Sequence, residues 1–145
     1  MHGQASKTTY LINGDVCDRG ENACEILLLI FALKLLHPHC IYFTRGNHET
    51  DWMNGDDHCG GFTREVKRKY SGRTFRLFST IFELWPIAAA IGAAVGEHDG
   101  ILVLHGGIPR HAHVSLGMLR DVDTRRQPPD NPSGIEDQAS GPPLA

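Results

Sequence analysis

The sequence predicts a mixed α/β (α+β) domain, and three observations lead to this fold class. An apolar strand, an apolar helix and a second apolar strand follow one another near the N-terminus. Two stretches with helical periodicity come next, and a hairpin pattern follows them. With 145 residues, the chain is long enough for one hydrophobic core and too short for two domains.

The first predicted unit is a strand–helix–strand succession. Tyr10–Asn13 is a short apolar run that ends in a glycine-containing loop, which is typical of a buried strand. Glu21–Leu36 is rich in Leu, Ile and Ala, begins with acidic residues and precedes Pro38, so it predicts a helix. Its apolar positions cover most of the circumference, and we expect the helix to be largely buried. Cys40–Thr44 is the next strand, and the crossover predicts two parallel neighbouring strands.

The second half of the chain changes from this pattern to helices and a hairpin. Between Gly60 and Trp85, apolar residues recur at helical spacing among charged ones, with a break near Ser71–Gly72 that predicts two helices. Ile87–Val95 and Ile101–Leu104 are predicted strands. The intervening Gly96–Gly100 has the residue types of a hairpin loop.

The C-terminal stretch is predicted to be a separate, disordered tail. Gln127–Ala145 is dominated by Pro, Gly, Ser, Asp and Gln and has few apolar residues to bury. We therefore expect residues 1–126 to form the domain and residues 127–145 a divergent tail.

Composition argues against several classes of partner and location. A net charge of −3 provides no basic field for nucleic acid and no polybasic patch for a membrane surface. The longest apolar run, Ile26–Leu36, contains Lys34 and is too short to span a bilayer, and the N-terminus lacks signal-peptide features. Cys24 and Cys40 are expected to be small buried hydrophobic residues, which favours a reducing, cytoplasmic or nuclear location.

Three polar clusters follow three predicted strands, namely Gly14–Gly20, Gly46–Glu49 and His105–Gly107. Ligands bind off the carboxyl ends of strands in open α/β sheets, and glycines there let the backbone turn sharply. A carboxylate, an amide oxygen and an imidazole form a ligand set that suits manganese, iron or zinc better than calcium. Asp18 and His48 would add an acid/base pair, and Arg19 would add a guanidinium for phosphate.

Each cluster taken alone also has a plain structural explanation. Asp-Arg-Gly is commonly a turn, Asn-His-Glu after a strand is commonly a helix cap, and His-Gly-Gly is commonly a loop. Their occurrence together, in order and each after an apolar strand, favours one shared site.

These clusters resemble the signatures of the phosphoprotein phosphatase family, which are GDxVDRG, RGNHE and HGG. Here they read GDVCDRG at 14–20, RGNHE at 45–49 and HGG at 105–107, and Cys17 stands where the family has Val. The likeness runs from about Tyr10 to Asp130. The stretches most similar to the type-5 phosphatase branch are Tyr10–Gly20, Glu65–Tyr70 and Arg126–Asp130.

The resemblance implies a fold and an activity. The fold would be part of a metallophosphoesterase-type β-sandwich flanked by helices, with residues 1–126 as a partial phosphatase catalytic domain. The activity would be hydrolysis of phosphoserine and phosphothreonine in phosphoprotein substrates. Two divalent metal ions (manganese, iron or zinc) would activate a hydroxide for this reaction.

The resemblance also implies a metal ligand set. Asp15 matches the carboxylate that bridges the two metals, and Asn47 and His105 match ligands of the second metal. The first metal would need an Asp and a His from an upstream GDxHG motif. Only His2-Gly3-Gln4 resembles the end of that motif, so we expect the first site to be incomplete, with His2 open as a ligand.

Further roles are implied for substrate binding and proton transfer. His48 matches the general acid, and Asp18 matches the carboxylate that orients it and keeps it cationic. Arg19, Asn47 and His48 would bind the substrate, with Arg19 on the phosphate. Arg45 and Glu49 are interpreted as structural supports of their loop.

Three functions remain open from the sequence. The first is the phosphatase activity, which we expect to be impaired because first-metal ligands and a downstream histidine and arginine are not recognised. The second is a non-catalytic, truncated phosphatase-like protein that binds phosphoproteins or phosphatase partners. The third, another metallophosphoesterase such as a nuclease or nucleotidase, is disfavoured by the RGNHE motif and the type-5-like stretches.

Overall fold

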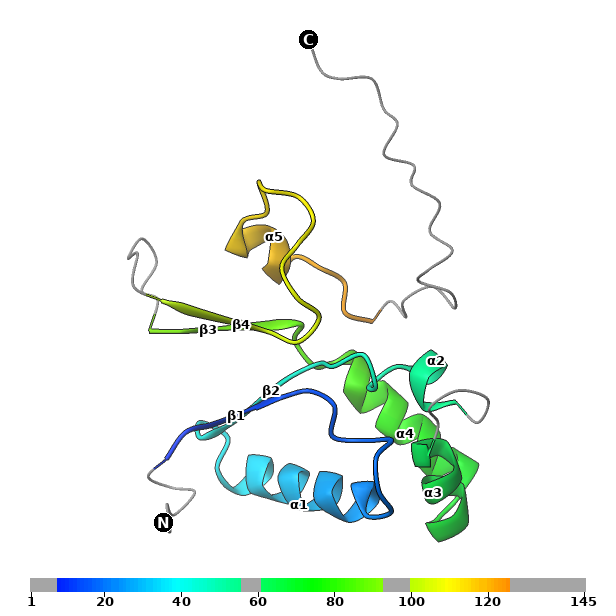
Figure 1. Cartoon of the computed structure of the whole chain (residues 1–145). Helices are drawn as coiled ribbons and strands as arrows, with labels where there is room; N and C mark the ends of the chain where they lie inside the picture. The colour runs from blue at the N-terminus through cyan, green and yellow to red at the C-terminus, as the bar shows by residue number, and fades with distance from the viewer. Residues whose placement is uncertain (1–7, 56–60, 93–99, 126–145) are drawn as a thin grey trace, which may run out of the picture.

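A computed structural model describes residues 8–55, 61–92 and 100–125 (Figure 1). Strands β1 (Tyr10–Asn13) and β2 (Ile41–Thr44) pair in parallel, with Tyr10 opposite Ile41 and Asn13 opposite Thr44. Helix α1 (Ala23–Leu36) connects them. The predicted strand–helix–strand unit is therefore confirmed, with its helix beginning two residues later than the acidic residue Glu21 suggested.

The predicted helical break at Ser71–Gly72 is also confirmed. It separates α3 (Gly61–Lys69) from α4 (Gly72–Glu83), and the Ser71 hydroxyl accepts a hydrogen bond from the Thr74 amide at the start of α4. A one-turn helix, α2 (Asp51–Asn54), follows the second polar cluster and was not predicted.

The hairpin strands form a second, antiparallel pair. β3 (Ala88–Ile91) pairs with β4 (Ile101–Leu104), with Ala88 opposite Leu104. β3 is shorter than the predicted 87–95 strand, and most of the predicted loop lies outside the described residues. The unpredicted helix α5 (Leu116–Arg120) follows.

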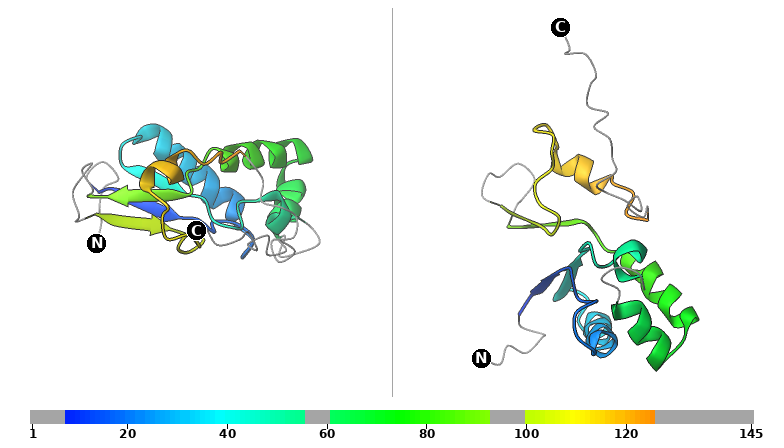
Figure 2. Two further views of the ribbon diagram at one scale, coloured as in Figure 1. Left: turned by 90° about the horizontal axis from the view of Figure 1, so that it is seen from above. Right: turned by 45° about the vertical axis from the view of Figure 1, so that its right-hand side comes forward.

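The two strand pairs lie between helices. Figures 1 and 2 show α1 against one side of the β1–β2 pair and α5 beyond the β3–β4 pair, with α3 and α4 at one end. This order of helix, sheet, sheet and helix agrees with the expected partial sandwich. The predicted tail at 127–145 lies outside the described residues.

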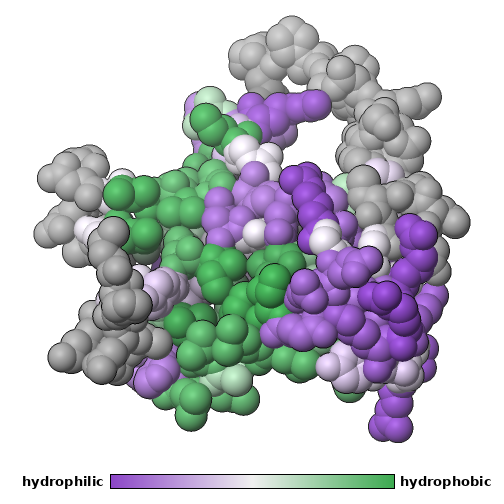
Figure 3. All heavy atoms as spheres, turned by 60° about the horizontal axis from the view of Figure 1, so that its bottom comes forward, coloured by the Kyte–Doolittle hydropathy of each residue, from purple (hydrophilic) through white to green (hydrophobic). Residues whose placement is uncertain are grey.

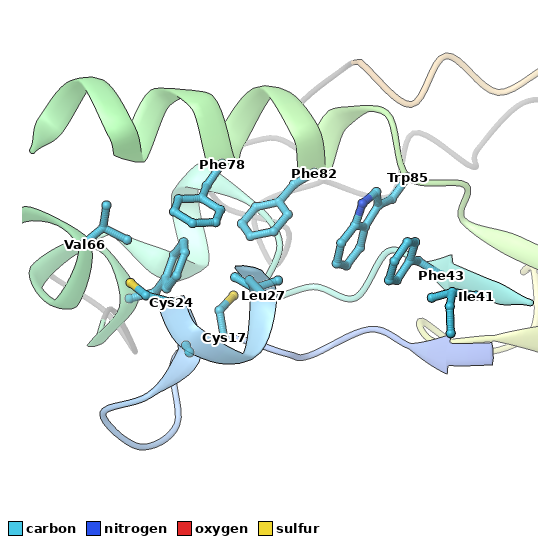
Figure 4. Close-up of a cluster of buried hydrophobic side chains, with 11 residues drawn as sticks. Cys17, Cys24, Leu27, Ile41, Phe43, Val66, Phe78, Phe82 and Trp85 are labelled. Carbon is cyan, nitrogen blue, oxygen red and sulfur yellow. The ribbon is translucent and has the colours of Figure 1, made fainter. Parts of the chain in front are cut away.

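The hydrophobic core lies between α1, α3, α4 and β2. Phe78 and Phe82 of α4 point toward Leu27 of α1, and the ring of Trp85 stacks on that of Phe43 with centroids 4.8 Å apart (Figure 4). Aromatic rings therefore fill much of the space between the helices and the sheet.

Helix α1 is less buried than its composition predicted. Only Ala23, Cys24 and Leu27 are buried, whereas five larger apolar residues are exposed: Ile26, Leu28, Leu29, Leu35 and Leu36. The expectation of a largely buried helix is wrong for the described residues, because α3 and β2 cover one side of α1 and its apolar positions extend around the other. Figure 3 shows this apolar face beside a hydrophilic one. Within the described residues, no helix is long and apolar enough to cross a membrane.

Candidate active site

Two glycines bring the first two polar clusters into direct contact. Gly14 has a φ of +66°, and a Cβ added to it would lie 2.5 Å from Cα of Gly46. A Cβ on Gly46 would lie 2.5 Å from a carboxylate oxygen of Asp15. Any larger residue at either position would force the loops after β1 and β2 apart, so these glycines set the approach of Asp15 to the second cluster.

The buried Glu49 carboxylate ties the same two loops together. It accepts hydrogen bonds from the amides of Asp15 at 2.8 Å, Val16 at 2.7 Å and Gly46 at 2.8 Å. Such charge-assisted bonds are stronger than neutral ones. Arg45 adds a bond from Nε to the Glu49 carbonyl oxygen at 2.9 Å. Both residues therefore make the supporting contacts that their position in the motif suggested.

Asp15, Asn47 and His105 come from three different loops and converge on one point. His105 Nε2 lies 3.2 Å from Asp15 Oδ1 and 3.2 Å from Asn47 Oδ1. Its other ring nitrogen, Nδ1, lies 2.7 Å from the Asn13 carbonyl oxygen, which can only accept a hydrogen bond. In the neutral imidazole the Nε2 lone pair therefore faces two oxygen lone pairs with no proton between them.

That arrangement fits a bound cation. Three electron-pair donors of carboxylate, amide and imidazole type lie together, and the hydrogen bond from Nδ1 fixes the tautomer that presents Nε2. Such a donor set is of the kind that binds divalent metal ions. The convergence expected for these side chains is confirmed.

Asp15, Asn47 and His105 form one candidate set of metal ligands in the part of the chain that the structure describes. Among the described residues, no group of three or more His, Cys, Asp or Glu side chains could bind a metal, and Asn47 is needed to complete the set. His2, the open candidate for the first metal, lies outside the described residues.

His48 and Asp18 form a buried pair beside this point. His48 Nδ1 lies 2.9 Å from Asp18 Oδ2, and the His48 amide donates to Asp15 Oδ1 at 3.2 Å. The second oxygen of Asp18 accepts from the Phe62 amide at the start of α3 at 2.9 Å. Burial raises the pKa of the Asp18 carboxyl, although the hydrogen bonds from Phe62 and His48 oppose that shift. The hydrogen bonds from Phe62 and His48 thus offset part of the cost of burying the Asp18 carboxylate.

The remaining predicted substrate-binding residues are accessible. Arg19 and Asn47 are exposed, and Arg19 makes no hydrogen bond or ion pair with another described residue. Asp18, immediately before Arg19, has a φ of +73°, and Asp15 has a φ of +54°. Left-handed backbone at two non-glycine residues is strained, and here it accompanies the loop that carries the candidate site.

Cys17, which departs from the family motif, is part of the core. It is 2% exposed, and its thiol donates to the His48 carbonyl oxygen at 3.2 Å. Burial, followed by the nearby Glu49 and Asp18 charges, raises the pKa of this thiol far above its ordinary value. The side chain therefore stays neutral and packs as a small hydrophobic residue.

Sequence reasoning missed two residues that position the site. Asn13 orients His105 through its carbonyl oxygen, and its side-chain amide donates to the Leu104 carbonyl oxygen at 3.3 Å. The signal for Asn13 was a polar residue at the end of an apolar strand. Phe62 holds Asp18 with its backbone amide, a contact for which side-chain identity gives no signal.

Comparison with known proteins places the chain in a family. Residues 2–141 match the family described as calcineurin-like phosphoesterase, so the chain belongs to that family. The match extends past both ends of the stretch from which the resemblance was inferred. The fold, with its two strand pairs and flanking helices, is that of part of a metallophosphoesterase domain.

The similar proteins are protein phosphatases of the type-5 kind. Serine/threonine-protein phosphatase T of Saccharomyces cerevisiae is 42% identical over 130 residues, which is 90% of this chain and 24% of that protein. Serine/threonine-protein phosphatase 5 of Homo sapiens is 41% identical over 132 residues, again 90% of this chain and 25% of that protein. The chain thus spans about a quarter of the length of these curated relatives.

A solved structure supports the same relationship. It is that of a protein serine/threonine phosphatase from Saccharomyces cerevisiae with similarity to a human phosphatase, PP5. It matches with a TM-score of 0.76 and 42% identity, covering 86% of this chain and 37% of the solved one. The predicted resemblance to the type-5 branch is confirmed.

Proposed function

We propose that this chain contributes a protein serine/threonine phosphatase site that hydrolyses phosphoserine and phosphothreonine with the help of divalent metal ions. The observation that carries the proposal is the convergence of Asp15, Asn47 and His105 beside the buried His48–Asp18 pair. Membership of the family and the names of the similar proteins support the substrate class.

Three side chains would hold a cation in this site. Asp15 would supply charge, while Asn47 and His105 would supply neutral donors. Such an ion, with a second beside it, would supply a hydroxide nucleophile and neutralise charge on the phosphate. The hydrogen bond from His105 Nδ1 to Asn13 keeps the Nε2 lone pair available throughout.

His48 would donate the proton to the leaving group. Its Nδ1 is engaged by Asp18, which leaves Nε2 as the ring nitrogen that can donate a proton to the departing serine or threonine oxygen. The 2.9 Å contact with Asp18 would fix the orientation of the ring. Arg19, exposed on the same loop, would bind phosphate oxygens with its guanidinium.

A second candidate function is supported by the ligand count. Asp15, Asn47 and His105 form one donor set, His2 lies outside the described residues, and a dinuclear centre needs two sets. With one cation the chain would bind phosphoproteins or phosphatase partners with little turnover. General-acid catalysis by His48 would then contribute only about 10²–10⁴-fold.

Metal content and turnover measured on the same sample separate the two functions. We expect the 145-residue chain with added manganese to bind one metal ion and to hydrolyse p-nitrophenyl phosphate and a phosphoserine peptide weakly. Asp15→Asn and His105→Gln should remove the metal, whereas His48→Gln should keep the metal and lose turnover. His113→Gln, an exposed histidine outside the site, is the control.

Each outcome of these measurements supports or contradicts one of the two functions or one residue assignment. Metal binding without any turnover would favour the second candidate function. Turnover that survives His48→Gln would contradict the assignment of that residue as the acid. Metal binding that survives both Asp15→Asn and His105→Gln would contradict the site itself.

A further inference from the structure

The α3–α4 segment carries a concentration of positive charge on an acidic chain. Six basic side chains and two acidic ones lie between Gly61 and Glu83, in a protein whose net charge is −3. Within α3, the buried positions are Phe62, Thr63, Glu65 and Val66, which leaves Arg64, Lys67 and Arg68 exposed. The basic side chains thus occupy the outward face of a helix whose other face is in the core.

Part of this face forms a hollow next to the Arg19 loop. It has a volume of about 290 Å³ and is lined by Gly20, Glu21, Gly61, Arg64, Glu65 and Arg68. Arg64 and Arg68 are four residues apart, so they lie on the same side of α3, one turn above the other. The hollow therefore presents two guanidinium groups in a row.

The hollow is joined directly to the proposed acid/base pair. The Phe62 amide donates to Asp18 at 2.9 Å, and a Cβ on Gly61 would lie 3.2 Å from the Asp18 carbonyl oxygen. Arg19 follows Asp18 in the chain. Gly20, the next residue, lines the hollow together with Arg64 and Arg68.

Two carboxylates, those of Glu65 and Glu21, line the hollow beside these arginines. The Glu65 carboxylate accepts from the amides of Ala23 and Cys24 and from Lys69 Nζ, so it is used within the fold. Glu21 is exposed at the rim and is the other carboxylate there.

We propose that Arg64 and Arg68 bind acidic residues that flank the phosphorylated residue of a peptide substrate. This inference rests on the proposed phosphatase function and adds a substrate preference to it. The helical rise places Arg64 about 4.5 Å and Arg68 about 10.5 Å beyond Gly61 along α3. An extended peptide advances about 3.3 Å per residue, so the two arginines are spaced to contact acidic side chains about two positions apart.

The test is fluorescence anisotropy with the full chain, manganese and two labelled phosphoserine peptides. One peptide has aspartates within four positions on both sides of the phosphoserine, and the other has serine and glycine there. We expect the acidic peptide to bind about three- to tenfold more tightly at low salt. Arg64→Ala with Arg68→Ala should remove that advantage and leave the affinity for the neutral peptide unchanged.

A matched variant controls for net charge. Arg73→Ala with Arg76→Ala removes two exposed charges from α4 outside the hollow and should preserve the preference. An equal loss in both double variants would overturn the inference, since total charge would then explain it. An unphosphorylated acidic peptide that binds equally well would overturn it too, by indicating a general polyanion surface such as one for nucleic acid.

Failure of the inference is distinguishable from failure of the proposed function. If both phosphopeptides bind equally and Arg19→Ala weakens both, the phosphate site stands and the acidic preference is rejected. If neither binds a chain that circular dichroism shows to be folded, the proposed function is rejected together with the preference.

Discussion

The part of the molecule before Pro86 and the part after it are held together in different ways. All eleven core residues lie between Cys17 and Trp85. None of the described residues from 86 to 125 is buried. The second part joins the first through polar contacts, such as those from Arg45 Nη1 to the Thr124 carbonyl oxygen at 2.7 Å and from Asn13 to Leu104.

The candidate site lies across this boundary. Asp15, Asp18, Asn47 and His48 belong to the well-packed part, whereas His105 belongs to the thinly packed one. The core and the hydrogen bonds to Glu49 therefore position most of the site, whereas His105 is positioned by its hydrogen bond to Asn13. A stable core in the first part is therefore not sufficient to place His105, which comes from the second part.

The largest effect on stability is expected from a substitution of Glu49. This residue joins the loops after β1 and β2 in the part of the molecule before Pro86. Glu49→Ala would leave three amides without their acceptor, and we expect a loss of about 4–6 kcal/mol in the free energy of unfolding. Urea unfolding followed by tryptophan fluorescence measures it. Glu21→Ala, at an exposed position, should change the midpoint little. An unchanged midpoint for Glu49→Ala would contradict the role of Glu49.

A matched pair of leucines compares the two parts directly. Leu27 is fully buried against α4, whereas Leu102 on β4 is 43% exposed. We expect Leu27→Ala to cost about 3 kcal/mol and Leu102→Ala less than about 1 kcal/mol, because only the first leaves a cavity. Thermal unfolding of both variants checks the difference. Similar losses would show that the second part has a core of its own.

Much of this architecture was predictable because local patterns determine it. The β1–α1–β2 unit follows from alternating apolar runs and a proline stop, and the α3–α4 break follows from Ser71 as a helix cap. The convergence at the strand ends follows from the parallel pairing of β1 and β2.

Other features depend on contacts that sequence patterns do not encode. The exposure of Leu29 and Leu35 depends on which side of α1 other elements cover. The short helices α2 and α5 have too few residues to show periodicity. The Phe62 amide near Asp18 depends on tertiary placement alone.

A smaller, pH-dependent effect on stability is expected from a substitution of Glu65. Its carboxylate, on α3, accepts hydrogen bonds from the first amides of α1. Burial alone would raise the pKa of Glu65, but hydrogen bonds from the Cys24 amide and Lys69 outweigh it and hold the pKa below 4.5. The folded state therefore gains stability above the unfolded pKa and loses it as pH falls through the folded pKa. We expect Glu65→Gln to cost about 1–2 kcal/mol at neutral pH, and the difference should narrow below pH 4.5.

The control for Glu65→Gln is Glu25→Gln, which removes the exposed carboxylate that also pairs with Lys69. We expect little change in unfolding at any pH, because solvent screens that pair. Urea unfolding from neutral to acidic pH measures both variants. A Glu65→Gln deficit that does not depend on pH would mean that shape, rather than charge, makes Glu65 important.

A comparably small effect on stability is expected from Asn13→Ala, at the boundary between the two parts. The substitution removes the hydrogen bond to the Leu104 carbonyl oxygen and the one that Asn13 Oδ1 accepts from the buried Thr44 hydroxyl, together worth about 1–2 kcal/mol, and keeps the backbone carbonyl that accepts from His105. The β4 strand should then exchange its amide hydrogens faster while α1 and α4 keep their protection. Manganese affinity should fall, because His105 is held less firmly. Asn22→Ala is the matched control, since the Asn22 side chain makes no capping bond. Unchanged exchange in β4 together with unchanged manganese affinity would show that His105 is positioned without Asn13, and that the thinly packed part supports its ligand by itself.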